Sequence, residues 1–172
     1  MKAQFNYWKA AIICIILLFL GAGLFFPLDT LVIRQQNSEN RLLIPMVGQK
    51  SFSLYYLHSV QKTPVQEHFV LAPGNQLLLT STHYQSYGVG LPFLPEEGTL
   101  SNDKGVFLLT GINRSYREIN IGFMPLAEQS LLYQDKRYEY KQYFEPGSLL
   151  QITVQKYSPF ALIWLMREGG TR

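Results

Sequence analysis

The side chains that could do chemistry gather in the segment FSLYYLHSVQKTPVQEHFVL, residues 52–71. Strand-like alternation on both sides of Gln61–Pro64 predicts a hairpin that turns at those residues. In that register His58 lies directly opposite Glu67, on a face that is otherwise apolar. A carboxylate beside an imidazole raises the pKa of the imidazole and sets its tautomer, so the two groups could act as a base and its orienting partner.

The same pair allows other interpretations. A hydrogen-bonded His58 and Glu67 could serve only to fix the strand register and orient the core, because a lone buried charge is costly. A slip by one residue would move both groups to the polar face. His83, near the end of the next expected strand, could join them as a third zinc ligand. The spacing does not resemble the close ligand pairs of zinc sites, so the sequence predicts no metal and no cofactor.

A second candidate segment, QSYGVGLP at residues 85–92, follows that strand directly. Gly88 and Gly90 can adopt positive φ or allow another backbone to approach closely, while Ser86 and Tyr87 could face a ligand. The prolines that follow do not readily begin a helix, which argues against a phosphate-binding loop. The segment is therefore either a rigid turn or a loop that presents N–H groups and side chains to a ligand.

Arginines and tyrosines complete the candidate groups. Arg114 and Arg117 could bind a carboxylate in bidentate fashion, or simply be surface charges. Four tyrosines near the same strands could line a cleft or fill the core, namely Tyr55, Tyr56, Tyr84 and Tyr87.

Strands are the elements that must position these residues. Alternating β-branched and aromatic residues separated by Gly, Pro, Asn and Asp turns recur from Arg41 onward. The pattern predicts an all-β domain, an antiparallel sandwich or a partly open barrel. Residues 126–132 could instead form a short helix. The apolar run at residues 159–166 is too short to span a bilayer as a helix, and we expect a buried last strand there.

An uncharged apolar run, Ala10–Phe26, precedes this domain. It predicts a transmembrane helix, with a cleaved signal peptide as the alternative. Lys2 and Lys9 lie before the run, so the positive-inside rule places the rest of the chain outside the cytoplasm, as a single-pass protein of the cell membrane. We expect a membrane anchor at residues 1–28, a linker at 29–40, an extracytoplasmic β-domain at 41–166 and a frayed tail at 167–172.

Composition limits which partners the protein can bind and what can hold its domain together. The chain has fifteen Lys and Arg residues and twelve Asp and Glu residues. Two of the lysines, Lys2 and Lys9, belong to the expected anchor. The exported part is therefore nearly neutral, which argues against nucleic acid as a partner. Cys14 is the only cysteine and lies in the apolar run, so packing alone must hold the domain.

Two motifs resemble a family of small exported proteins of unknown function, whose genes commonly lie beside those of TAXI-type TRAP transporters. The first is HSVQKTPVQEHF, residues 58–69, in which His58, Ser59, Thr63 and Glu67 match the family pattern. The second is YQSYGVGLP, residues 84–92, in which Ser86, Gly88 and Gly90 match. An arginine-containing strand near Arg117 and a Pro-Gly turn at Pro146-Gly147 agree more loosely with the family pattern. The resemblance covers most of the chain after the apolar run.

The resemblance implies a context more than a mechanism. It favours a non-catalytic accessory domain on the outer face of the membrane, which meets a transporter permease or its solute receptor. The matching residues, together with Tyr87, are then candidate contacts for a ligand or partner. An exported hydrolase is the alternative, with His58 and Glu67 as base and orienter and Ser86 as nucleophile, since Ser59 points to the opposite face from His58. A small-ligand binding module is the third possibility.

Overall fold

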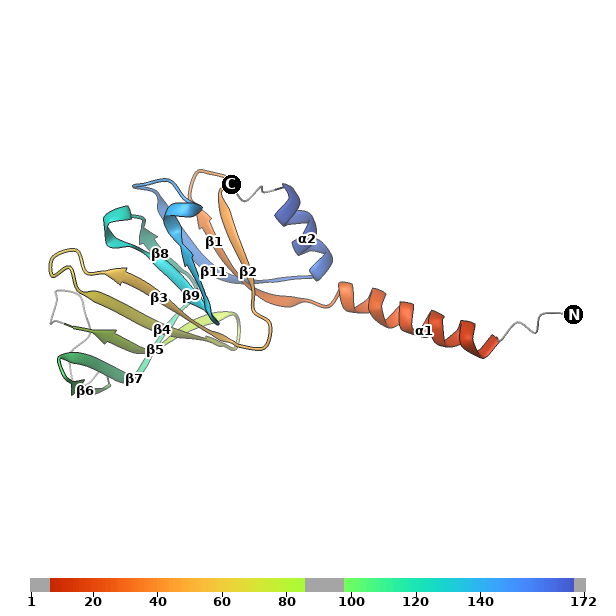
Figure 1. The fold of residues 1–172 in the computed structure, drawn as a ribbon, viewed down its shortest axis with the longest axis horizontal. Helices are drawn as coiled ribbons and strands as arrows, with labels where there is room; N and C mark the ends of the chain where they lie inside the picture. Colours follow the sequence, from red (N-terminus) through yellow and green to blue (C-terminus); the bar gives the residue numbers. More distant parts are fainter. Residues whose placement is uncertain (1–6, 86–97, 169–172) are drawn as a thin grey trace, which may run out of the picture.

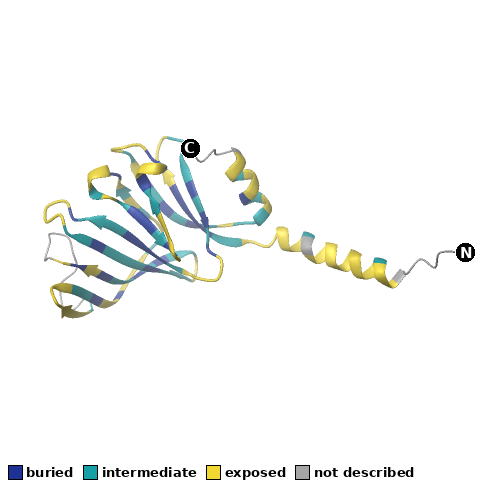
Figure 2. Ribbon diagram, in the orientation of Figure 1, coloured by how far each residue is buried: buried dark blue, intermediate teal, exposed yellow. Residues whose placement is uncertain are grey.

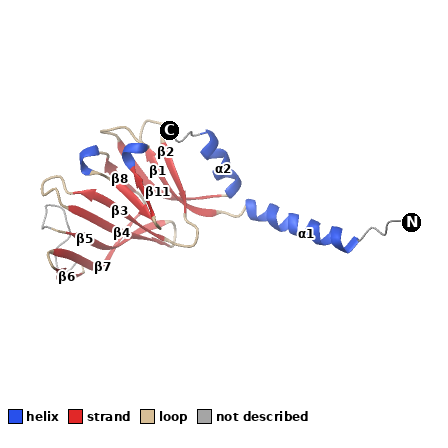
Figure 3. Ribbon diagram, viewed as in Figure 1, coloured by secondary structure: helices blue, strands red, loops and turns tan. Residues whose placement is uncertain are grey.

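The computed structural model describes residues 7–85 and 98–168. They fold into two antiparallel β-sheets that face each other as an open sandwich, with an α-helix at either end of the chain (Figure 1 and Figure 3). The prediction of a sandwich is confirmed. The strand order is β2-β1-β11-β8 in the smaller sheet and β10-β9-β3-β4-β5-β7-β6 in the larger one.

The smaller sheet joins the two ends of the domain. Its strands are β1 (Leu28–Gln35), β2 (Arg41–Pro45), β8 (Ile119–Gly122) and β11 (Leu149–Tyr157). β1 pairs with β11 along its whole length, from Leu28 opposite Tyr157 to Gln35 opposite Leu150. Most of β1 is buried, so the sandwich is built around a strand from the region that we expected to be a linker.

The larger sheet carries the candidate residues. Its strands are β3 (Ser51–Leu57), β4 (Pro64–Ala72), β5 (Gln76–Tyr84), β6 (Thr99–Asp103), β7 (Val106–Tyr116), β9 (Ser130–Tyr133) and β10 (Lys136–Glu139). Two short 3-10 helices, η2 (Pro125–Ala127) and η3 (Tyr140–Gln142), flank β9 and β10. After β7 the chain crosses to the smaller sheet at Arg117-Glu118 and forms β8.

The core lies between the two sheets. Buried and part-exposed residues alternate along β2 and much of β11, as expected for strands with one face inside (Figure 2). Leu31 and Ile33 from the smaller sheet meet the same core as Phe52, Phe69 and Leu131 from the larger one. The rings of Phe52 and Phe69 stack with their centroids 5.3 Å apart. Because the described chain has no disulfide, this apolar packing holds the sheets together.

One local prediction was wrong. Residues 159–166 do not form a buried strand: they belong to α2 (Pro159–Glu168). Ser158 explains the difference, because its hydroxyl accepts a hydrogen bond from Ala161 N–H at 3.2 Å and Pro159 follows it, which is a strong start signal for a helix. The possible helix at 126–132 is divided between η2 and β9.

The predicted N-terminal helix is present as α1 (Tyr7–Leu24). Most of its described side chains are exposed, including Leu17 and Leu18 (Figure 2). None of the helices in the part of the chain that the structure describes is both long and apolar enough to cross a membrane. The prediction of a transmembrane helix is therefore not supported, although the helix itself is found.

Candidate functional site

The hairpin of β3 and β4 turns differently from the prediction. Leu57 faces Pro64 as the last strand pair, so the turn holds residues 58–63 rather than 61–64. His58 N–H donates to the carbonyl of Thr63 at 2.9 Å, and Lys62 N–H donates to the carbonyl of His58 at 2.9 Å. Lys62 adopts a positive φ of 55° to close the turn.

This register separates the predicted pair. Leu54, not His58, lies opposite Glu67. The buried imidazole of His58 instead belongs to the turn, where its Nδ1 accepts hydrogen bonds from the backbone N–H of Val60 at 3.4 Å and of Gln61 at 3.3 Å. The pairing predicted between His58 and Glu67 is therefore wrong, because the turn is longer than its Pro and polar residues suggested.

Each side chain of the hairpin strands nevertheless lies on the face that the sequence predicted. The observed register differs from the predicted one by four residues, an even number, and side chains alternate with a period of two. Glu67 therefore remains on the inner face of the sheet, in line with Val65 and Phe69, as the sequence predicted. Ser59 is exposed in the turn and Thr63 is part-buried at its end.

The three candidate metal ligands do not come together. In β5, His83 faces Gln66 while Thr82 faces Glu67, so His83 and Glu67 point to opposite sides of the sheet. His83 is exposed. Within residues 7–85 and 98–168, no group of three or more His, Cys, Asp or Glu side chains is arranged to hold a metal ion. The suggested ligand set of His58, Glu67 and His83 is wrong on this geometry.

The other predicted contacts have different outcomes. Ser86, Tyr87, Gly88 and Gly90 lie outside the described residues. Arg117 is exposed in the connection from β7 to β8. Arg114, on β7, is the arginine whose positive charge acts on Glu67.

Glu67 accepts a hydrogen bond on the inner face. The hydroxyl of Tyr56 donates to Oε1 of Glu67 at 3.3 Å, from the neighbouring strand β3. Burial raises the pKa of the Glu67 carboxyl, while this hydrogen bond and the charge of Arg114 lower it without offsetting the burial. Burial and the nearby carboxylate also raise the pKa of the Tyr56 hydroxyl, so Tyr56 remains a donor at neutral pH.

A cavity of about 330 Å³ opens beside this pair. It lies where β3 and β4 of the larger sheet face β8 of the smaller one. Leu54 and Ile121 give it apolar walls, as is usual for ligand pockets, which have volumes of roughly 300–1,000 Å³. We call it the inter-sheet cleft, and its lining is Leu54, Tyr55, Tyr56, Glu67, Ile121, Gly122, Gln129, Ser130 and Tyr140.

Buried hydroxyl groups line or adjoin the cleft. The hydroxyls of Tyr140 and Ser130 are buried and have no hydrogen-bond partner among the described residues. The same holds for Thr82, whose Cα lies opposite that of Glu67 in β5. An unsatisfied buried hydroxyl costs about 1–3 kcal/mol, and native proteins contain few of them. Several such groups near one cavity make the cleft a candidate site for a polar molecule.

Packing holds the cleft residues in place. Tyr140 is 1% exposed, and its ring makes edge contacts with Phe123 and Phe144 at centroid distances of 6.3 and 5.9 Å. Gln129 donates from Nε2 to the carbonyl of Gly122 at 3.0 Å and accepts from Met124 N–H at 2.8 Å. Its side chain therefore ties β8 to the start of β9 and forms a fixed wall of the cleft.

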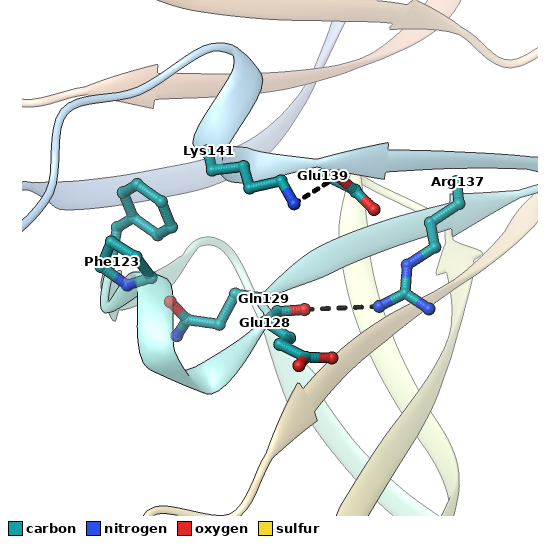
Figure 4. A pocket seen from close by; sticks show the side chains of 7 residues that line it. Phe123, Glu128, Gln129, Arg137, Glu139 and Lys141 are labelled. Carbon is teal, nitrogen blue, oxygen red and sulfur yellow. Dashed lines mark hydrogen bonds and ion pairs between the residues drawn. The ribbon is translucent and has the colours of Figure 1, made fainter.

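A second, smaller pocket of about 220 Å³ adjoins this wall, because Gln129 lines both (Figure 4). Lys141 Nζ lies 3.1 Å from Oε2 of Glu139, and Arg137 donates to the carbonyl of Glu128 at 3.5 Å (Figure 4). The lysine lowers the pKa of Glu139. Two cations and two carboxylates balance each other here, so the pocket has no clear preference for an ion of either sign.

Part of this site could be predicted from the sequence. The inner-face position of Glu67 followed from alternation, and Tyr56 was among the tyrosines expected in a cleft or the core. Ser130, Tyr140 and Gln129 were missed. They come from a distant part of the chain, and only the pairing of β9 with β3 brings them to the hairpin.

Comparisons with known proteins place the chain in a family. The profile described as "Domain of unknown function (DUF1850)" matches residues 52–140, just over half of the chain. The matched region runs from β3 to Tyr140 and includes every residue that lines the inter-sheet cleft. Comparisons with curated proteins and with solved structures gave no match. The chain belongs to the DUF1850 family.

Proposed function

We propose that this protein is a small-ligand binding domain that uses the inter-sheet cleft, and that it works as an accessory domain at the outer face of a membrane. The observation that carries the binding function is a cavity of about 330 Å³ lined by the part-buried carboxyl of Glu67 and by Tyr140, whose hydroxyl has no hydrogen-bond partner among the described residues. Polar groups that converge in an apolar cleft provide specificity in ligand sites.

The lining favours a small organic molecule with several oxygen atoms. The hydroxyls of Tyr140 and Ser130 can donate hydrogen bonds to carbonyl, carboxyl or hydroxyl oxygens. Because burial raises the pKa of Glu67, this carboxyl more readily binds a proton and can then donate as well. Leu54 and Ile121 would contact the carbon skeleton of the ligand.

The arrangement gives less support to a hydrolase. That mechanism needs a histidine beside the carboxylate that orients it, and Nδ1 of His58 is engaged by the backbone of its own turn. A binding role needs only the cleft and its polar groups.

Membrane attachment and transporter association are the second part of the proposal. Exposed apolar side chains along α1, from Trp8 to Leu24, would bury their surface in lipid. Lys2 and Lys9 precede the apolar run, which supports a location of the β-domain outside the cytoplasm. The resemblance to proteins encoded beside TAXI-type transporters suggests a solute receptor or permease as the partner that exchanges ligand with the cleft.

A thermal-shift panel tests the binding function. The full-length chain, held in detergent micelles, is melted with small carboxylic acids, hydroxy acids, amides and sugars. Compounds that bind should raise Tm for the wild type and raise it less for Tyr140→Phe. Tyr143→Phe is the matched control, because Tyr143 packs against the core but does not line the cleft. Equal shifts in all three proteins would contradict binding at this site.

A further inference from the structure

The exposed face of α2 is apolar up to Arg167 in its last turn. Phe160, Ile163 and Trp164 occupy positions i, i+3 and i+4 on one side of the helix, and they are 58, 56 and 54% exposed. The buried Leu162 faces the domain instead. A surface helix ordinarily turns a polar face to water, so this arrangement indicates a second apolar contact.

The exposed face continues a surface that begins on α1. Phe25, just after the end of α1, lies against Phe160 with ring centroids 5.9 Å apart. Phe26 beside it is 73% exposed. Figure 1 shows α2 next to the junction of α1 and β1, running away from α1 rather than along it. Phe25, Phe26 and the apolar face of α2 therefore extend the apolar surface of α1 over the end of the β-domain that lies next to α1.

The charges near the junction also fit a membrane surface. Lys50 lies 2.6 Å and Lys156 4.0 Å from the carboxylate of Asp29, at the start of β1. Two lysines around one aspartate leave a net positive charge beside the apolar face, and both side chains are at least half exposed. Aromatic residues next to basic ones are typical of the boundary between headgroups and acyl chains.

We propose that α2 is an interfacial helix, whose face of Phe160, Ile163 and Trp164 lies in the headgroup region of the lipid bilayer that receives α1. This inference rests on the proposed membrane attachment and deepens it. With two points of contact, the β-domain could not rotate freely about α1. It would hold a fixed orientation, with α2 at the lipid and η2, which lies next to β8 and away from α1, in water (Figure 1).

Tryptophan fluorescence tests the proposal, because the chain has two tryptophans, Trp8 and Trp164. The Trp8→Phe variant of the full-length chain is reconstituted into phosphatidylcholine vesicles that contain some phosphatidylglycerol. The remaining Trp164 should show blue-shifted emission, loss of quenching by iodide, and strong quenching by lipids brominated near the headgroup end of the acyl chain. Lipids brominated near the methyl end should quench it less.

A matched control uses Leu126, which is 82% exposed on η2. The triple variant Trp8→Phe, Trp164→Phe, Leu126→Trp should remain quenched by iodide and unaffected by brominated lipids. Emission of Trp164 that resembles this control, in protein that floats with the vesicles, would overturn the inference while leaving membrane attachment intact. Shielding of Trp164 that varies with protein concentration but not with bromination would indicate a second copy on α2 and overturn it as well. Failure to float would overturn the attachment and the inference together.

Discussion

The hydroxyl of Tyr56 donates a hydrogen bond to Oε1 of Glu67 at 3.3 Å, on the inner face of a β-sandwich. The two residues belong to adjacent strands of one hairpin, and the inter-sheet cleft opens beside them. This pair places a carboxyl group with a raised pKa at the edge of a cavity.

Tyr56→Phe should remove the hydrogen bond from the Tyr56 hydroxyl to Oε1 of Glu67, which stabilises the charged form of Glu67. We expect a loss of about 1–2 kcal/mol in the free energy of unfolding at pH 7, and a further rise in the pKa of Glu67. Urea denaturation and infrared titration of the carboxyl measure the two effects. Tyr157→Phe is the control, because its hydroxyl donates to Gln155 away from the cleft. An unchanged pKa of Glu67 would show that the Tyr56 contact is not made in solution.

Glu67→Gln should change the pH dependence of stability in a defined direction. The folded-state pKa of Glu67 is raised, so the folded protein binds more protons than the unfolded chain above about pH 4.3, the ordinary glutamate value. The stability of the wild type relative to Glu67→Gln should therefore fall as the pH rises from that value to the folded-state pKa, and then level off. Urea denaturation at a series of pH values measures this difference.

Glu139→Gln is a control for which the pH dependence of stability should have the opposite sign. Lys141 lowers the pKa of Glu139, so this carboxylate contributes stability above its unfolded-state pKa and loses that contribution as the pH falls. The effect should be small, because the side chain lies at the surface. If the two variants showed slopes of the same sign, the assignment of a raised pKa to Glu67 would be wrong.

Tyr140→Phe removes a buried hydroxyl that has no partner among the described residues. Without ligand, the variant should be as stable as the wild type or more stable by up to about 1–2 kcal/mol, because no hydrogen bond within the protein is lost. Denaturation of the ligand-free proteins checks this. A loss of stability above about 1 kcal/mol would indicate that the hydroxyl already has a partner inside the protein.

His58→Ala should destabilise the hairpin rather than abolish a reaction. Nδ1 of His58 accepts from Val60 and Gln61, so its loss leaves these N–H groups to water, at a cost of about 1 kcal/mol. His58→Asn keeps a side-chain acceptor and should recover part of the stability. If both variants unfolded at the same urea concentration as the wild type, the turn would not depend on the imidazole.

Much of the fold could be predicted from alternation, because a period of two reveals which face of a strand is buried. Glu67 was assigned to the inner face even though the register was wrong, since an even shift leaves the faces unchanged. The register was wrong because the turn is longer than expected. Lys62 adopts a positive φ in this turn, which its residue type does not predict.

Other features could not be predicted because they depend on tertiary contacts. β1 was taken as a linker, and only its pairing with β11, more than a hundred residues away, makes it a central strand. Ser130 and Tyr140 reach the cleft through the pairing of β9 with β3. The start of α2 was the one local signal that was missed, since Ser158-Pro159 favours a helix N-terminus.

The most direct test of the central claim is isothermal titration of the best panel compound into three full-length proteins, namely wild type, Tyr140→Phe and Tyr143→Phe. Binding in the inter-sheet cleft predicts that the affinity falls at least about tenfold for Tyr140→Phe, the loss of one buried hydrogen bond, and stays unchanged for Tyr143→Phe. Equal affinity in all three proteins, or the absence of any panel compound that binds the wild type, would contradict it.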